Sequence, residues 1–354
     1  MKKLLTIFIC IGLCLAGCSA VPPEAPPSAV PTPSATKTAQ VTPTAAPTQA
    51  APTATVGPDY LIRLSIQSEV LEDNLAGTPA KRKLVVSLPP SYYDAEKSYP
   101  VVYYLHGFGE LAGAYIADND EALHAAFQNG AKEFIFVEVD GGSSFYVNSP
   151  VSGRWEDYVM SEVIPFIDET YRTLPKAESR GICGFSMGGF GALNLAMRHP
   201  DVFGAVYAMS PGLLTEDGLA EAMETWGYDS AFKASYARAF APNPDAELLG
   251  DIPAMDGSEA DNAVIEQWKN GFGNLPEKLN AYLALGTPLR GIGLCYGTKD
   301  NYGWIPKGTA YFSSLLEGKG IAHTLYTFTG SHTQPTDGMT EHLLPFFNET
   351  LIYE

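Results

Sequence analysis

Positively charged side chains are scarce in this chain. Its 354 residues include 22 Lys and Arg against 40 Asp and Glu, a formal net charge of −18, and the basic residues form no cluster. Nucleic acids and anionic lipid surfaces attract basic patches, so neither is expected as a partner. The sequence also contains no internal repeats.

Cysteine and histidine are scarce as well. Cys10, Cys14 and Cys18 lie at the N-terminus, which leaves Cys183 and Cys295 for the folded part, each inside an apolar, strand-like run. An exported protein could pair these two, but we expect their strands not to be neighbours and both thiols to be buried. The six histidines lack the spacing of metal ligands, so no metal and no cofactor is implied.

The first eighteen residues are predicted to be a leader. A short basic start precedes an apolar run at 4–15 that is too short to span a bilayer as a stable helix. The run ends in Leu15-Ala16-Gly17-Cys18, which resembles the lipobox of bacterial lipoproteins. Cleavage there would leave Cys18 as a lipidated N-terminus, and membrane contact would be only through that anchor. The alternative is an ordinary secretory signal with a coincidental cysteine and a secreted product.

Aromatic and charged side chains are almost absent from residues 19–58. The segment has no aromatic residue, its only charges are Glu24 and Lys37, and ten of its forty residues are proline. It cannot bury enough surface to offset the entropy of ordering, so we predict a disordered Pro/Thr/Ala-rich linker. The linker follows the lipobox directly, which favours a cell-surface lipoprotein.

Residues 59–354 carry nearly all the aromatic side chains and are expected to form one α/β domain.

Strand-like and helix-like segments alternate along this domain, which predicts a mostly parallel sheet with helices on both faces. Residues 213–290 break the alternation and are expected to form a helical cap inserted between two late strands. A run of apolar residues at helical spacing from Trp155 to Tyr171 predicts a helix with Ser152 as its N-cap. The eight strands are expected at 61–70, 81–88, 101–105, 134–137, just before Ser186, 205–209, 292–296 and 324–328, and further helices at 112–128, 309–316 and 339–351.

Residues 180–192 hold the motif around which the chain is organised. An apolar strand-like run leads into Gly184-x-Ser186-x-Gly188, and a helix-like run follows. This order is typical of the nucleophile elbow of the α/β-hydrolase fold, in which a serine is exposed on a tight strand-to-helix turn. Glycines allow the close backbone approach, and the helix N-terminus favours a developing oxyanion. The alternative is a glycine-rich turn with an idle serine.

An acyl-transfer serine needs a base and an orienting acid, which in this fold follow in the order Ser, Asp or Glu, His. Asp300 comes just after the predicted strand 292–296, and His332 just after the predicted strand 324–328. The carboxyl ends of strands are where ligand chemistry gathers in open α/β sheets. We therefore predict Ser186, Asp300 and His332 as a catalytic triad. The alternative for Asp300 is a solvated turn residue.

The oxyanion hole is expected to use two backbone N–H groups. One is that of Met187, and the other comes from the loop His106-Gly107-Phe108-Gly109, with Phe108 preferred and Gly109 second. We expect His106 to brace this loop and to take no part in proton transfer.

Residues 80–350 resemble the putative-esterase family of α/β-hydrolases, which includes feruloyl and acetyl-xylan esterases, S-formylglutathione hydrolases and mycolyltransferases. The resemblance rests on Tyr103-Tyr104-Leu105-His106-Gly107, on Gly184-Phe185-Ser186-Met187-Gly188-Gly189 and on Trp155-Glu156-Asp157-Tyr158-Val159. The segment 141–146 also resembles a loop near the active site of the mycolyltransferases. The resemblance implies the same triad. Because those transferases are expected to carry Glu where this chain has Asp300, it favours a hydrolase.

The sequence therefore predicts a surface-tethered serine esterase acting on small-molecule or polysaccharide esters, feruloyl and acetyl esters among them. An acyltransferase of the mycolyltransferase type, which passes the acyl group to a sugar hydroxyl, is the first alternative. A catalytically idle binding protein is the second. Five aromatic residues are candidates to line a sugar or aromatic-acid site: Tyr146, Trp155, Trp226, Tyr302 and Trp304.

Overall fold

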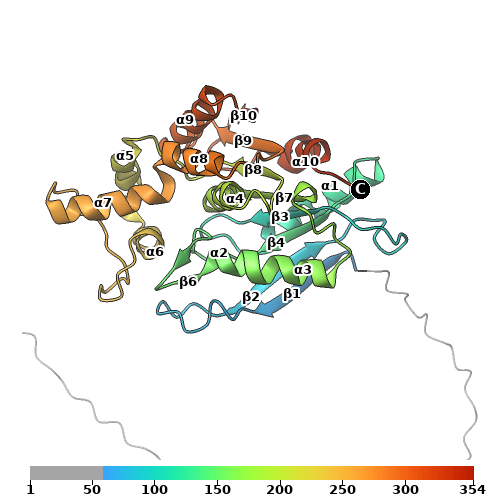
Figure 1. The fold of residues 1–354 in the computed structure, drawn as a ribbon, viewed down its shortest axis with the longest axis horizontal. Helices are drawn as coiled ribbons and strands as arrows, with labels where there is room; N and C mark the ends of the chain where they lie inside the picture. The colour runs from blue at the N-terminus through green and yellow to red at the C-terminus, as the bar shows by residue number, and fades with distance from the viewer. Residues whose placement is uncertain (1–58) are drawn as a thin grey trace, which may run out of the picture. The chain divides into compact units, whose positions relative to one another are not determined.

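An eight-stranded sheet forms the centre of the domain in a computed structural model that describes residues 59–354 (Figure 1). The predicted leader, Cys18 and the linker 19–58 lie outside the described residues. The strands are β1 (Leu61–Gln67), β2 (Lys81–Ser87), β3 (Val101–Leu105), β4 (Ile135–Val139), β7 (Arg180–Phe185), β8 (Ala205–Met209), β9 (Gly291–Gly297) and β10 (Thr324–Phe328). Their order is β1-β2-β4-β3-β7-β8-β9-β10. The pairs β1–β2 and β2–β4 are antiparallel and the others parallel, so the predicted mostly parallel sheet is confirmed.

The central strands β3 and β8 are apolar throughout because helices cover both faces of the sheet. Along β3, Val102 and Tyr104 belong to one core cluster, whereas Val101, Tyr103 and Leu105 belong to the other. The first cluster includes side chains of α1 (Ala114–Gln128) and α10 (Leu344–Thr350). The second includes side chains of α3 (Ile164–Thr170), α4 (Met187–Arg198), α8 (Leu275–Ala284) and α9 (Trp304–Gly318).

The helix predicted from Trp155 is continuous but not regular. It begins as α2 (Trp155–Asp157), passes through a π-helical turn at Tyr158–Val163 and continues as α3. The predicted N-cap was wrong, because the short hairpin of β5 (Asn148–Ser149) and β6 (Gly153–Arg154) runs directly into the helix. Arg154 is therefore the N-cap, and Ser152 lies in the hairpin turn, where its carbonyl oxygen accepts the indole N–H of Trp155 over 2.8 Å.

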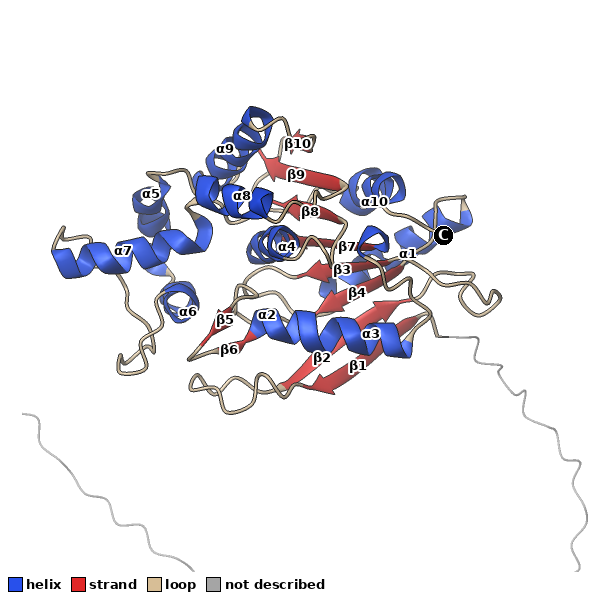
Figure 2. Ribbon diagram, in the orientation of Figure 1, coloured by secondary structure: helices blue, strands red, loops and turns tan. Residues whose placement is uncertain are grey.

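Residues 213–290 contain four α-helices between β8 and β9, in agreement with the predicted helical cap. They are α5 (Gly218–Thr225), α6 (Ser230–Phe240), α7 (Glu259–Phe272) and α8. Figure 2 shows α5, α6 and α7 grouped beyond the arrowheads of β8 and β9. The cap is therefore placed at the end of the sheet where the predicted catalytic residues follow their strands.

The two cysteines of the described domain are unpaired, as expected. Cys183 lies on β7 and Cys295 on β9, and β8 runs between them. Burial raises the pKa of both thiols above the ordinary range, to about 12 for Cys295, so neither is a reactive thiolate.

Two features are absent from the described residues. No helix in 59–354 is both apolar and long enough to cross a membrane. In the same residues, no group of three or more His, Cys, Asp and Glu side chains is placed to hold a metal ion.

Candidate active site

Ser186 occupies the sharp turn between β7 and α4. Its φ of 54° and ψ of −114° are strained for a residue with a side chain, as a nucleophile elbow requires. The neighbouring glycines are needed for space. A Cβ at Gly188 would lie 1.9 Å from the carbonyl oxygen of Leu105, and one at Gly184 would lie 2.3 Å from that of Gly188. The elbow therefore packs α4 directly against the end of β3.

The three residues of the predicted triad form one chain of hydrogen bonds. His332 Nε2 lies 2.9 Å from Ser186 Oγ, and His332 Nδ1 lies 2.7 Å from Asp300 Oδ2. The other carboxylate oxygen of Asp300 accepts the N–H of Tyr302 over 2.8 Å, and the Asp300 side chain is fully buried. In this geometry the carboxylate holds a proton on Nδ1 and leaves Nε2 free to accept the proton of the serine hydroxyl.

The residues of both predicted oxyanion donors line the same cavity as Ser186. Met187 is the first residue of α4, where N–H groups have no intrahelical acceptor, and Phe108 follows β3. Within the described residues, neither N–H group is paired with an acceptor. The N–H of Gly107, by contrast, donates to Glu110 Oε2 over 2.7 Å. Two backbone donors are thus available near the serine, and the choice of Phe108 remains a prediction.

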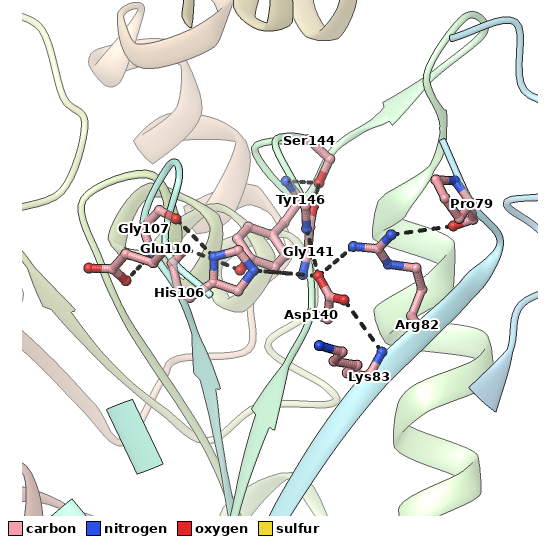
Figure 3. A network of polar contacts seen from close by, with 11 residues as sticks. Pro79, Arg82, Lys83, His106, Gly107, Glu110, Asp140, Gly141, Ser144 and Tyr146 are labelled. Carbon is pink, nitrogen blue, oxygen red and sulfur yellow. Dashed lines mark hydrogen bonds and ion pairs between the residues drawn. The ribbon is translucent and has the colours of Figure 1, made fainter. Parts of the chain in front are cut away.

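His106 holds the loop that carries Phe108 (Figure 3). Its Nδ1–H donates to the carbonyl oxygen of Gly107 over 2.8 Å, and its Nε2 accepts the N–H of Gly141 over 3.1 Å. These partners require the neutral, Nδ1-protonated ring. His106 is buried and lies outside the triad, in agreement with its expected bracing role.

Asp140 connects this loop to the antiparallel edge of the sheet. It pairs with Arg82 on β2, and its carboxylate lies 3.8 Å from His106 Nε2 (Figure 3). Burial opposes ionisation, but the charge and hydrogen bond of Arg82, together with the hydrogen bond from the N–H of Gly142, outweigh it and hold the pKa of Asp140 well below its usual range. The carboxylate is therefore ionised at neutral pH and compensates the charge of Arg82.

The segment 141–146 supports the same loop from the other side. Phe145 and Tyr146 both have φ of 56°, a left-handed conformation that is uncommon for large residues. The Tyr146 hydroxyl donates to the carbonyl oxygen of His106 over 3.1 Å, and the Phe145 ring lies 6.1 Å from that of Phe108. Sequence patterns gave no indication of this bracing, because it depends on two strained backbone positions.

A cavity of about 350 Å³ opens at Ser186 and His332. Trp226, Tyr302 and Trp304 line it, as considered from the sequence, whereas Tyr146 and Trp155 are buried core residues outside it. The cap supplies several lining residues that sequence reasoning missed, because no pattern placed 213–290 over the serine. The added cap side chains are those of Thr225, Asp229, Phe232 and Phe272, and Glu110 and Ile305 line the cavity from outside the cap.

Comparison with known families gives a match to the family described as "Putative esterase" over residues 76–264, more than half of the chain. The chain belongs to that family. The matched residues of this putative esterase contain the elbow and the His106 loop, whereas Asp300 and His332 lie beyond them. The resemblance inferred from the motifs is thereby confirmed.

Individual relatives of this putative esterase are similar over part of its length. An esterase of Mycobacterium tuberculosis is 32% identical over 142 residues, which cover 37% of this chain and 30% of that protein. An acetyl esterase of Caldicellulosiruptor saccharolyticus is 24% identical over 236 residues, 64% of this chain and 79% of that enzyme. The chain thus spans less than a third of the length of the mycobacterial relative.

Solved structures support the same fold. A ferulic acid esterase from Anaeromyces mucronatus superposes with a TM-score of 0.53 and 20% identity, covering 84% of this chain and 93% of that one. At this identity the likeness concerns the fold, and it agrees with the observed sheet order and elbow. The chain therefore has the α/β-hydrolase fold, as predicted.

Proposed function

We propose that the protein is a serine esterase that hydrolyses carboxylic esters through an acyl-enzyme. The observation that carries this proposal is the hydrogen-bonded chain from Ser186 Oγ through His332 to the buried Asp300 carboxylate, at the mouth of a cavity. Membership of the putative esterase family supports it.

In the proposed reaction, Ser186 Oγ attacks the ester carbonyl carbon while His332 Nε2 takes the hydroxyl proton. The N–H groups of Met187 and Phe108 stabilise the oxyanion of the tetrahedral intermediate. Its collapse breaks the bond to the alcohol, which leaves with the proton from His332. Water then attacks the acyl-Ser186 ester with His332 again as base, so that the acid is released and the serine hydroxyl is restored.

The substrate class that we propose is a small ester or an ester-substituted polysaccharide. The names of two similar proteins, an acetyl esterase and a ferulic acid esterase, support acetyl and feruloyl groups as first candidates. The aromatic side chains of Trp226, Phe272 and Trp304 around the cavity are suited to a planar or apolar group.

We also propose that Cys18 is lipidated and that the linker 19–58 tethers the enzyme outside the cytoplasm, with secretion as the alternative.

Acid release from acetyl, butyryl and feruloyl esters tests the proposal. Wild-type protein, Ser186→Ala and a matched control, Ser314→Ala on the exposed side of α9, are compared. Turnover by the wild type and the control, with loss of at least about 10³-fold in Ser186→Ala, is expected. Equal rates in all three would reject it. Adding a sugar acceptor and analysing products distinguishes hydrolysis from acyl transfer.

A further inference from the structure

The cavity beside Ser186 has an unbalanced charge. Glu110 and Asp229 are the carboxylates among its lining residues outside the triad, and no Lys or Arg side chain of the described domain lines it. The whole chain is also acidic, with a formal net charge of −18. A ligand that enters the cavity therefore meets negative charge on two sides, from the His106 loop and from the cap.

Neither carboxylate is neutralised by a basic partner. Asp229 caps α6 by accepting the N–H of Phe232 over 2.8 Å, and Glu110 accepts the N–H of Gly107 over 2.7 Å. In residues 59–354 neither forms an ion pair. Lys233, one turn along α6, directs its ammonium group to the carbonyl oxygen of Gly227 over 3.4 Å. Each carboxylate thus has one oxygen held by the backbone and a charge available to a ligand.

Aromatic rings supply the second feature of the cavity. Trp226 lies 5.0 Å from Phe232 and 5.3 Å from Trp304, measured between ring centroids, and Phe272 lies 5.8 Å from Trp304. All four rings line the cavity. Aromatic faces attract cations, and such clusters beside a carboxylate are suited to ammonium and quaternary ammonium groups.

From these contacts we propose that the substrate carries a positive charge on the group that occupies the cavity. Asp229 and the Trp226 ring are the residues that contribute most to this preference for a cationic group. The inference rests on the proposed esterase function and narrows its substrate to cationic esters. In a partly solvated cavity, such contacts increase the affinity for a charged group by a factor of about 3–10 at low salt. That gain falls as ionic strength rises.

Isosteric ester pairs test the inference. Acetylcholine is compared with 3,3-dimethylbutyl acetate, in which carbon replaces the quaternary nitrogen, and an acyl-side pair consists of 4-nitrophenyl 4-(trimethylammonio)butanoate and 4-nitrophenyl 5,5-dimethylhexanoate. The expected kcat/KM ratio of cationic to neutral ester exceeds about 3 for at least one pair at low salt and falls when salt is added. A ratio of one or less for both pairs overturns the inference while leaving the esterase proposal intact.

The variants are chosen to remove charge and keep hydrogen bonds. Asp229→Asn preserves an N-cap acceptor, and Glu110→Gln preserves an acceptor for the N–H of Gly107. Asp245→Asn removes an exposed charge of the same insertion outside the cavity and is the matched control. The ratio should fall in Asp229→Asn and stay constant in Asp245→Asn. An unchanged ratio in Asp229→Asn, or an equal fall in both, rejects the assignment to the cavity.

A binding measurement separates this inference from failure of the esterase proposal. If no ester is hydrolysed, calorimetry on Ser186→Ala compares choline with 3,3-dimethylbutanol. Tighter binding of choline, weakened by Asp229→Asn, supports a cation site without any turnover. Equal or weaker binding of choline overturns it.

Discussion

The hydroxyl group of Tyr146 donates a hydrogen bond to the backbone carbonyl oxygen of His106 over 3.1 Å. His106 is followed by Gly107 and Phe108, so this bond fixes the start of the loop that carries a proposed oxyanion donor. Both partners are buried, which makes the bond insensitive to competition from water. A side chain far from the reacting atoms can therefore control the placement of a catalytic N–H group.

Tyr146→Phe is expected to lower kcat by about tenfold with little change in KM, because a displaced oxyanion donor weakens binding of the transition state more than of the ester. The free energy of unfolding should fall by about 1 kcal/mol. Steady-state kinetics and urea unfolding measure the two effects. Tyr158→Phe is the control, since the buried Tyr158 hydroxyl has no partner. Equal kcat in Tyr146→Phe and wild type would contradict the bracing role.

Asp300→Asn is expected to lower kcat by about 10³–10⁴-fold, because an amide favours the wrong tautomer of His332. The fold should survive, since an asparagine oxygen can still accept the N–H of Tyr302. Circular dichroism measures whether the fold is retained, and the rate of ester hydrolysis as a function of pH measures the loss of activity. Asp337→Asn, an exposed residue of the loop after β10 that also carries His332, serves as the control. A decrease in kcat of less than about tenfold would show that a residue other than Asp300 orients His332.

Asp140→Asn is expected to lower the free energy of unfolding at pH 7 by about 3–5 kcal/mol, because it leaves the buried Arg82 charge unpaired. The low pKa of Asp140 means that its stabilising contribution is complete above the ordinary carboxyl pKa and is lost as pH falls toward the folded-state value. The difference between wild type and variant should therefore shrink below about pH 4.

Unfolding in urea between pH 7 and pH 3 measures this difference. Asp157→Asn, which removes one partner of the exposed ion pair with Arg154, should cost less than about 1 kcal/mol. A gap between wild type and Asp140→Asn that stays constant down to pH 3 would show that the carboxylate is not the source of the effect.

Gly188→Ala is expected to prevent assembly of the elbow, because its Cβ would lie 1.9 Å from a backbone oxygen of β3 that cannot move aside. We expect a loss of at least about 3 kcal/mol in unfolding free energy, together with loss of activity. Gly318→Ala at the end of α9, where no atom lies within 4 Å of the added Cβ, should be neutral or slightly stabilising. An active, normally stable Gly188→Ala protein would contradict the elbow geometry.

Much of the site could be predicted from the order of strands and motifs along the chain. Ser186, Asp300 and His332 each follow a predicted strand, and the order of strands in this fold brings such positions to one edge of the sheet. The same reasoning placed β3, β8 and β10 at their observed bounds. These features depend on the spacing of apolar residues and on the turn residues that end strands and helices. Both can be read directly from the sequence.

Features that depend on tertiary packing were not predictable in this way. Phe232 on α6 and Phe272 on α7 both line the cavity at Ser186, and nothing in 213–290 indicates which of its side chains reach that cavity. The N-cap at Ser152 was wrong because a two-residue strand pair moved the helix start. The left-handed Phe145 and Tyr146 likewise depend on the packing around them.

Acylation of Ser186 is the step on which the proposed mechanism depends, and intact-protein mass spectrometry detects it directly. Residues 59–354 are mixed with excess 4-nitrophenyl acetate and quenched in acid within the first turnover, and the modified peptide is sequenced. A mass increase of one acetyl group is expected on Ser186, absent from Ser186→Ala and retained in Ser314→Ala. Release of nitrophenol by the wild type without any acetyl group on Ser186 would contradict it.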